Sequence, residues 1–138
     1  MAILTKKKAD DANTTWAQGG IACVQGEEDS FDRHVADTLD AGAGLCPEDV
    51  VRTIVSEGPR AIDELIAWGV NFDRHRNEKG KEELSLGREG GHTKRRVLHY
   101  KDTTGKEIET KLLAAVAEAE NIDLLEHHFA IDLITTTK

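Results

Sequence analysis

Short apolar runs alternate along this chain with longer stretches in which apolar residues recur every three or four positions. The run at 1–6 is too short for a helix and predicts a buried strand, and the run at 122–125 also predicts a strand. Between them, Phe31 and Val35 lie four positions apart and share one face of an expected amphipathic helix. The order of strand, loop, helices, strand, helix and strand predicts an α/β domain that occupies residues 1–138.

Capping residues give the expected bounds of the helices. Ser30 can cap a helix that Gly42 ends, and Pro47, followed by two acidic residues, suits the start of a second helix. The dipeptide Gly58-Pro59 predicts the end of that helix and the start of another. The remaining expected elements are the strands 21–24, 96–100 and 129–134, the turns 77–80 and 102–105, and the helix 108–116.

The charge balance argues against nucleic acid as a partner. Charged residues make up 32% of the chain and the formal net charge is −8, and such an acidic surface repels a phosphate backbone. The basic run 6–8 is followed at once by Asp10 and Asp11, so it forms no extended patch. No apolar run approaches the roughly 18 residues of a membrane span, and no signal-peptide pattern is found. These features predict a cytoplasmic protein with no membrane partner.

The cysteines and histidines indicate neither a disulfide framework nor a metal site. Cys23 and Cys46 have no CxxC partner, so two reduced thiols are expected. The six histidines show no HxxxH or Cys/His ligand spacing, and no metal site is predicted. The sequence also contains no GxSxG, P-loop or GxGxxG motif.

One segment after the first strand carries the residue types of a ligand-binding loop. It consists of Asn13, Thr14, Thr15, Trp16, Ala17, Gln18, Gly19 and Gly20. Its hydroxyls, amide and N–H groups offer mixed donors and acceptors, and its two glycines allow the backbone to approach a ligand closely. A planar heterocycle or a pyrophosphate would suit such a loop. A plain surface loop explains the same residues, and composition alone leaves both interpretations open.

A second segment, at 88–96, gathers charge around two glycines. It reads REGGHTKRR and contains four cationic side chains, one carboxylate and one histidine. A loop that bends at its glycines could present these groups to a small anionic substrate. A solvated, charged surface loop is the alternative that composition also supports.

Six segments spread over the chain carry a joint signature. They are TWAQGGIA, HVADTLDAGAGLC, EDVV, LIAWGVNFDR, REGGHTKRR and LLEHHFAIDLI. Together they closely resemble the L-aspartate oxidases, a branch of the succinate dehydrogenase and fumarate reductase flavoprotein family. The resemblance covers essentially all 138 residues, and the combination is far more specific than any single motif.

The resemblance implies a partial, Rossmann-like FAD-binding domain over residues 1–138. Family members begin with a strand, a Gly-rich turn and a helix that hold the FAD pyrophosphate, and this chain is expected to start after that unit. Members also continue past the position of Lys138 into a capping domain. We therefore expect a fragment that lacks its first βα unit and the capping domain, that is inactive alone, and that self-associates through uncovered surfaces.

Carried over by position, the resemblance places FAD against two segments. Thr5 and Lys6, at the end of the first strand, match family contacts with the adenosine side of FAD. The loop of Asn13, Thr14, Thr15, Trp16, Ala17, Gln18, Gly19 and Gly20 matches the segment around the flavin. Asn13 stands where the succinate dehydrogenase branch has a histidine that bonds covalently to the flavin. An amide cannot form that bond, so FAD is expected to be held non-covalently.

Glu89 matches the glutamate that orients the substrate in the family. Aspartate differs from succinate by an ammonium group, and a buried carboxylate discriminates strongly in favour of such a cation. The succinate-type enzymes have an uncharged motif at this place. Arg88 and His92 flank Glu89, and the resemblance assigns them no defined role.

The reaction that the resemblance implies is FAD-dependent oxidation of L-aspartate to iminoaspartate, with oxygen or fumarate as the electron acceptor. Quinolinate synthase would use the product in the de novo route of NAD and pyridine nucleotide biosynthesis. Two alternatives stay open. One is a succinate dehydrogenase or fumarate reductase flavoprotein, which Glu89 and the missing histidine at position 13 disfavour. The other is a non-catalytic, self-associating segment.

Overall fold

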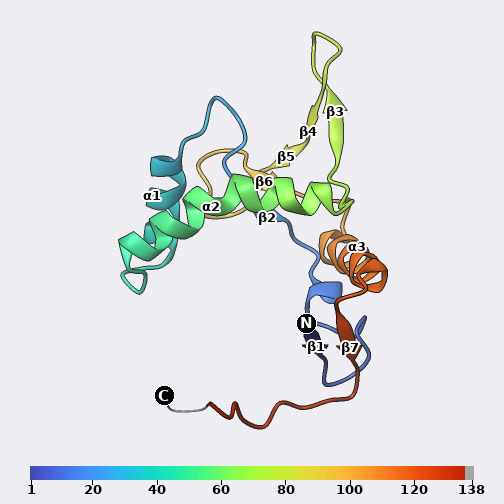
Figure 1. Ribbon diagram of the computed structural model, residues 1–138. Coiled ribbons are helices and arrows are strands. Elements are labelled where there is room, and N and C mark those ends of the chain that lie inside the picture. Colours follow the sequence, from blue (N-terminus) through green and yellow to red (C-terminus); the bar gives the residue numbers. More distant parts are fainter. Residues whose placement is uncertain (136–138) are drawn as a thin grey trace.

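Three helices connect three small sheets in the computed structural model, which describes residues 1–135 (Figure 1). In the first sheet, β1 (Ala2–Leu4) lies parallel to β7 (Asp123–Leu125). The second sheet is antiparallel and has the order β2 (Ile21–Ala22), β6 (Val97–Leu98) and β5 (Leu86–Gly87). The third is an antiparallel hairpin of β3 (Arg74–Arg76) and β4 (Glu82–Leu84). The strands predicted at 1–6, 21–24, 96–100 and 122–125 are confirmed, each of them shorter than predicted. The predicted burial of the first strand is wrong, because Ala2 and Leu4 are exposed. The mixed helix and strand content expected from the sequence is also confirmed.

The helix α1 (Phe31–Ala41) begins and ends where the capping residues predict. The Ser30 hydroxyl oxygen accepts a hydrogen bond from the Arg33 N–H at 3.3 Å and so caps the first turn. At the other end, the Gly42 N–H donates to the Thr38 carbonyl oxygen at 2.9 Å. Ser30 and Gly42 each act within a few residues of a helix end. Because these effects are local, the sequence predicted both ends of α1 correctly.

The helix α2 (Glu48–Ala67) runs through Gly58-Pro59, so the predicted break is wrong. A proline inside a helix costs about 3 kcal/mol because it removes one hydrogen bond and crowds the preceding turn. Here Val55 and Ile62, on either side of the proline, are only 6% and 1% exposed. Gly58 also permits close packing, since a Cβ there would lie 3.4 Å from the Cys23 sulfur. Burial of this apolar face on both sides of Pro59 offsets the local cost and keeps the helix continuous.

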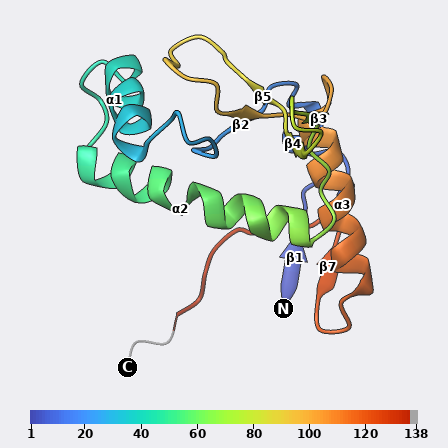
Figure 2. The ribbon, with the colours of Figure 1, turned by 90° about the horizontal axis from the view of Figure 1, so that it is seen from above.

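The helix α3 (Thr104–Glu118) begins inside the turn that was predicted at 102–105. It then covers the whole of the predicted helix 108–116. Figure 2 shows α2 crossing the molecule from the region of α1 to that of α3. Within residues 1–135, no helix has both the length and the apolar character needed to cross a membrane.

The core is divided into two small clusters. The larger one brings α2 and α3 against the sheet of β2, β6 and β5, and its buried members are Cys23, Ile62, Val70, Phe72, Leu98 and Ile108. The smaller one lies between α1 and α2 and contains Val35, Val51 and Val55. The small size of both clusters agrees with the hydrophobic content of the chain, which is 38%.

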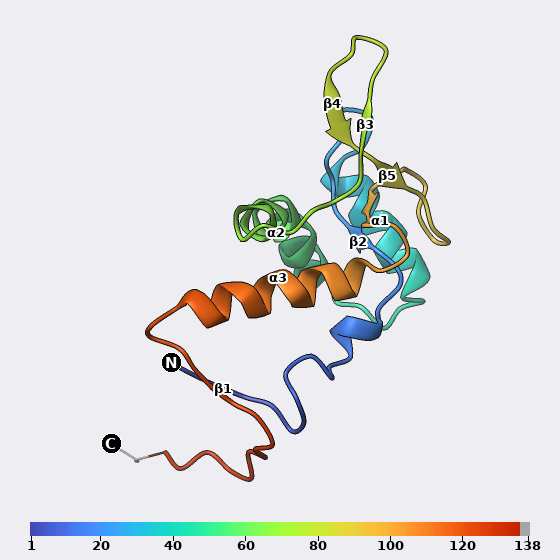
Figure 3. The ribbon, with the colours of Figure 1, turned by 90° about the vertical axis from the view of Figure 1, so that its right-hand side faces the viewer.

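The segment that follows β7 does not form the strand predicted at 129–134. Figure 3 shows it trailing beyond β1, and Ile131 and Leu133 are 92% and 87% exposed. Within residues 1–135, no strand lies beside this segment to exchange hydrogen bonds with it. An apolar alternation predicts a strand only where a partner strand is present, and this condition is not met here.

The hairpin of β3 and β4 projects away from the helices (Figure 3). Its turn confirms the prediction at 77–80, because the Asn77 N–H donates to the Lys81 carbonyl oxygen at 2.9 Å and Gly80 has a φ of 75°. The two strands were not predicted, since their residues are mostly charged and none of them is buried. Backbone pairing alone, rather than an apolar pattern, defines them.

Candidate functional site

A cavity of about 520 Å³ opens beside the segment that follows β1. Residues from both segments predicted to bind FAD line it, namely Thr5, Lys6, Asn13 and Trp16. Lys7 and Lys8 also line the cavity, and Lys7 forms an ion pair of 3.1 Å with Asp11. The Trp16 ring is 75% exposed. The cavity therefore combines ammonium groups, a hydroxyl, an amide and an open aromatic surface.

Hydrogen bonds from the residues around β7 hold this segment in place. The Thr5 N–H donates to the Leu125 carbonyl oxygen at 3.0 Å, and the His128 N–H donates to the Thr5 carbonyl oxygen at 2.9 Å. The Glu126 carboxylate accepts a 2.7 Å hydrogen bond from the Ala9 N–H. Glu126 was not among the predicted site residues, because its bond joins parts of the chain that are distant in sequence. The shape of the cavity thus depends on residues from both ends of the described chain.

The loop 13–20 contains the short 3₁₀ helix η1 (Thr14–Trp16), which rests on the first turn of α3. The Gly105 N–H donates to the Ala17 carbonyl oxygen at 3.0 Å. A Cβ on Gly105 would overlap the Thr14 carbonyl oxygen, so this approach requires glycine. The position of η1 is therefore fixed by a glycine far along the chain.

The two glycines that end this loop face different neighbours. A Cβ on Gly20 would overlap the Leu98 carbonyl oxygen and the Val97 side chain of β6. A Cβ on Gly19 would instead lie 3.9 Å from Oε1 of Glu89, which is an ordinary contact distance. The structure therefore places the Glu89 carboxylate beside the loop 13–20, although the two are far apart in sequence.

Replacing Gly20 by alanine is expected to lower the free energy of unfolding by about 1–3 kcal/mol, the usual cost of overpacking a tight contact. Replacing the adjacent Gly19 by alanine should change it by less than about 0.5 kcal/mol, because the added methyl group meets no close neighbour. Urea unfolding of the two variants and the parent chain measures both values. Equal losses for the two variants would show that Gly20 does not hold the loop against β6.

Arg96 is the largest side chain that is fully buried within residues 1–135. Its Nε and Nη2 donate to the two carboxylate oxygens of Asp29 at 2.7 and 2.8 Å. Its Nη1 donates to Oδ2 of Asp37 at 2.5 Å. Asp29 precedes α1 and Asp37 lies within it, so one guanidinium joins the strand β6 to the helix α1.

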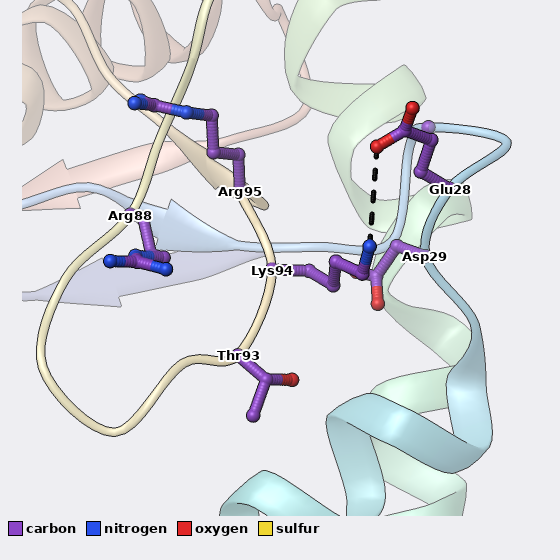
Figure 4. A pocket seen from close by; sticks show the side chains of 7 residues that line it. Glu28, Asp29, Arg88, Thr93, Lys94 and Arg95 are labelled. Carbon is purple, nitrogen blue, oxygen red and sulfur yellow. Dashed lines mark ion pairs between the residues drawn. The ribbon is translucent and has the colours of Figure 1, made fainter.

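The charged loop between β5 and β6 is attached to the same carboxylate. Both the N–H and the hydroxyl of Thr93 donate to Oδ2 of Asp37, at 2.9 and 3.0 Å. Figure 4 shows one side of this loop, where Thr93 and Lys94 face Glu28 and Asp29 across a cavity of about 360 Å³. The Lys94 ammonium lies 4.0 Å from the Glu28 carboxylate. The loop is thus a folded part of the structure rather than only a solvated charged segment.

Hydrogen bonds stabilise the charged forms of this buried group. Burial alone would raise the pKa of the Asp29 carboxyl, but hydrogen bonds from Arg96 and Ser30 bring that pKa below its ordinary value. Burial likewise opposes ionisation of Asp37, and hydrogen bonds from Thr93 and Arg96 lower the pKa of Asp37 overall. Hydrogen bonding to Asp29 in turn raises the pKa of Arg96. The guanidinium and both carboxylates therefore stay charged at neutral pH.

His34 of α1 lies against this charged group and is 7% exposed. Its ring centroid is 5.8 Å from that of His92, and its Nδ1 has no hydrogen-bond partner among the described residues. Burial lowers the pKa of His34, and positive charge on Arg96 and His92 lowers it further. The carboxylates of Asp29 and Asp37 oppose this shift without reversing it. The folded protein therefore favours neutral His34.

The lowered pKa of His34 predicts that stability falls as the pH drops below about 6.5, the ordinary value for histidine. In that range the unfolded chain binds a proton at His34 and the folded chain does not, so protonation favours unfolding. Unfolding free energies measured at about pH 7.5 and about pH 5.5 should differ less in a His34→Gln variant than in the parent chain. An unchanged pH dependence in His34→Gln would contradict this assignment.

The structure brings the predicted site residues together in two places. One is the cavity beside Thr5, and the other is the place where the Glu89 carboxylate lies near Gly19. Asp29 and Asp37 were not predicted as site residues. Arg96 begins the apolar run RVLHY, and an arginine that is buried requires buried acidic partners, so this run was the available signal. Within residues 1–135, no group of three or more potential ligand side chains is placed to hold a metal ion.

Comparison with protein families gives a match over the whole chain. The family described as "FAD binding domain" matches residues 1–138. The chain is 49% identical over 98% of its length to an L-aspartate oxidase, chloroplastic, of Oryza sativa subsp. japonica, of which it covers 20%. It is 46% identical over its full length to an L-aspartate oxidase of Pseudomonas aeruginosa, of which it covers 26%. The chain thus spans only a fifth to a quarter of these relatives.

Solved structures show a similar arrangement of the chain. An E. coli quinol fumarate reductase superposes with a TM-score of 0.85 at 30% identity, over 95% of this chain and 22% of that one. A flavocytochrome c3 fumarate reductase in its open conformation gives a TM-score of 0.72 at 16% identity, over 99% of this chain and 28% of that one. The second likeness concerns the fold alone.

Proposed function

Because this chain belongs to the FAD binding domain family, we propose that it is part of a longer, FAD-dependent L-aspartate oxidase. The identity of 46–49% with L-aspartate oxidases over nearly the whole chain supports this assignment. The single structural observation that carries it is the Glu89 carboxylate beside Gly19 of the loop 13–20. This arrangement brings the proposed substrate-orienting group near the proposed flavin-binding loop.

The residues around the 520 Å³ cavity fit FAD by their chemistry. The Thr5 hydroxyl and the Lys6 ammonium suit hydrogen bonds to the ribose and base on the adenosine side of FAD. The exposed Trp16 ring offers a flat apolar surface to a heterocycle. Asn13 also lines the cavity and carries no group that could bond covalently to a flavin, which supports non-covalent binding.

Bound FAD would supply the chemistry of the reaction, by accepting a hydride from the Cα of aspartate. The residues of this chain would bind the cofactor and orient the substrate. Glu89 would accept hydrogen bonds from the substrate ammonium, and the loop 13–20 would hold the flavin beside the substrate. The product would be iminoaspartate. Oxygen or fumarate would accept the electrons, and quinolinate synthase would use the product. A cytoplasmic location remains a prediction, and the plant relatives are named chloroplastic.

A succinate dehydrogenase or fumarate reductase flavoprotein is the second candidate, favoured by the likeness to quinol fumarate reductase. Two residues argue against it. Succinate offers no cation for Glu89 to bind, and Asn13 occupies the position of the covalent attachment.

Self-association also remains a prediction, and the exposure of Leu45, Ile131 and Leu133 supports it. A partial Rossmann-like domain is part of the same proposal.

The assignment is tested on the longer protein with its flavin bound. Under anaerobic conditions, aspartate should bleach the visible absorbance of the oxidised flavin, and succinate should leave it unchanged. Bleaching by succinate but not by aspartate would favour the second candidate. A longer protein that holds no flavin at all would overturn both.

A further inference from the structure

We propose that Asp37, Arg96 and Thr93 are positioning residues that fix the orientation of Glu89. This inference rests on the proposed function, in which Glu89 orients the substrate. We call the three side chains the loop clamp, because together they attach the segment 88–95 to α1. None of the three is proposed to contact the substrate itself.

The clamp is organised around one oxygen atom. Oδ2 of Asp37 accepts three hydrogen bonds, two from Thr93 and one from Arg96, at 2.5–3.0 Å. Asp37 is 9% exposed, and the side chain of Arg96 is fully buried. Hydrogen bonds that involve a buried charge are stronger than those between neutral groups. The clamp therefore holds the middle of the loop firmly to the helix.

Both ends of the loop are also anchored. The Arg96 N–H donates to the Gly87 carbonyl oxygen at 3.0 Å, which closes the base of the loop between β5 and β6. The Cys23 N–H donates to the Arg96 carbonyl oxygen at 2.8 Å and ties the same residue to the chain beyond β2. With its base closed by the sheet and Thr93 held by Asp37, the loop has few ways left to move.

Glu89 depends on this support because its own side chain is not held. Glu89 is exposed, and no hydrogen bond joins its carboxylate to any other residue in 1–135. Gly90 and Gly91 follow it, and Gly91 has a φ of 82°, a conformation that favours glycine. Across these two glycines the backbone is held, within residues 1–135, only by a long hydrogen bond of 3.3 Å from the His92 N–H to the Glu89 carbonyl oxygen, so its position depends on how Thr93 is fixed. The clamp therefore sets where the Glu89 carboxylate lies relative to Gly19.

The test replaces the Thr93 hydroxyl, because Thr93 is at the surface and its loss should not unfold the protein. Thr93→Val removes one hydrogen bond to Asp37 and keeps the branched shape, whereas Thr93→Ser keeps the hydroxyl. In this chain, amide hydrogen exchange at residues 89–93 should become about two- to tenfold faster in Thr93→Val. Thr93→Ser should exchange like the parent chain.

The functional readout uses the same variants in the longer protein. The ratio of aspartate oxidation to fumarate reduction should fall about two- to tenfold in Thr93→Val, mainly through kcat, and return in Thr93→Ser. Thr53→Val provides the matched control, since the Thr53 hydroxyl bonds the Asp49 carbonyl oxygen at 2.9 Å on the exposed side of α2. That variant should change neither exchange in the loop nor the activity ratio.

Each outcome decides the inference. Unchanged exchange at residues 89–93 in Thr93→Val would show that the clamp does not hold the loop. Faster exchange with an unchanged activity ratio would show that the clamp is structural and does not position Glu89. If the parent protein oxidises no aspartate, the proposed function fails, while the exchange measurement still decides whether the clamp holds the loop.

Discussion

Replacing Arg96 by methionine is expected to lower the free energy of unfolding of this chain by about 3–5 kcal/mol, the usual cost of breaking a buried ion pair. The substitution keeps much of the side-chain length, so lost volume contributes little. It leaves the carboxylates of Asp29 and Asp37, with side chains only 3% and 8% exposed, without their cation. Since domains are commonly stable by only about 5–15 kcal/mol, such a loss brings this chain close to unfolding. Urea unfolding followed by circular dichroism measures it.

Arg60 offers a control with the same chemistry in a different setting. It also pairs with two carboxylates, those of Glu57 and Glu64, both at 2.9 Å, but its side chain is 72% exposed. Exposed ion pairs contribute about 0–1 kcal/mol, so Arg60→Met should lower the unfolding free energy only slightly. If Arg60→Met and Arg96→Met lose the same amount, the buried pairs of Arg96 are not the source of the effect.

Replacing Glu89 by glutamine in the longer protein is expected to lower kcat/KM for aspartate by roughly ten- to a hundred-fold. Glutamine keeps the shape and some hydrogen-bonding capacity but removes the charge. A hydrogen bond to a charged group contributes about 1.5–3 kcal/mol, which corresponds to that range. Fumarate has no ammonium group, so its reduction should fall much less. Steady-state rates with both substrates give the ratio that matters.

The control for this substitution is Glu78, an exposed glutamate in the turn of the hairpin. Glu78→Gln changes the net charge equally and lies in the turn of the hairpin that projects away from the helices (Figure 3), so both activities should stay at the parent level. If Glu89→Gln lowers aspartate oxidation and fumarate reduction by the same factor, Glu89 shapes the loop and does not recognise the ammonium group.

Local signals predicted much of the helical structure correctly. Ser30 and Gly42 bound α1, and Gly69, with a φ of 89°, follows the end of α2. The same kind of signal failed at Gly58-Pro59, because packing on both sides of the proline decides whether the helix continues. Sequence alone shows the cost of a helix breaker but not the burial that offsets it.

Only part of the candidate site was predicted, because the rest also depends on packing between distant parts of the chain. The loop 13–20 and Glu89 were singled out by resemblance, and only the fold shows that the Glu89 carboxylate lies near Gly19. The partners of Arg96 were missed, because Asp29 and Asp37 are about 60 positions away from it in the chain. No local pattern reports which carboxylates will surround a buried guanidinium. Only the packing of α1 against the loop before β6 brings these residues together.

The pairing of β1 with β7 has a consequence for the order of events during synthesis. Ala2 pairs with Asp123, so β1 has no partner among residues 1–135 until the ribosome has released residues near 123. At about 5–20 residues per second, the wait is about 6–24 s, during which the apolar strand is open to chaperones or to other nascent chains. The cavity beside Thr5 also needs Glu126 and His128 for its shape. The FAD binding proposed for this cavity must therefore follow translation of this stretch rather than accompany it.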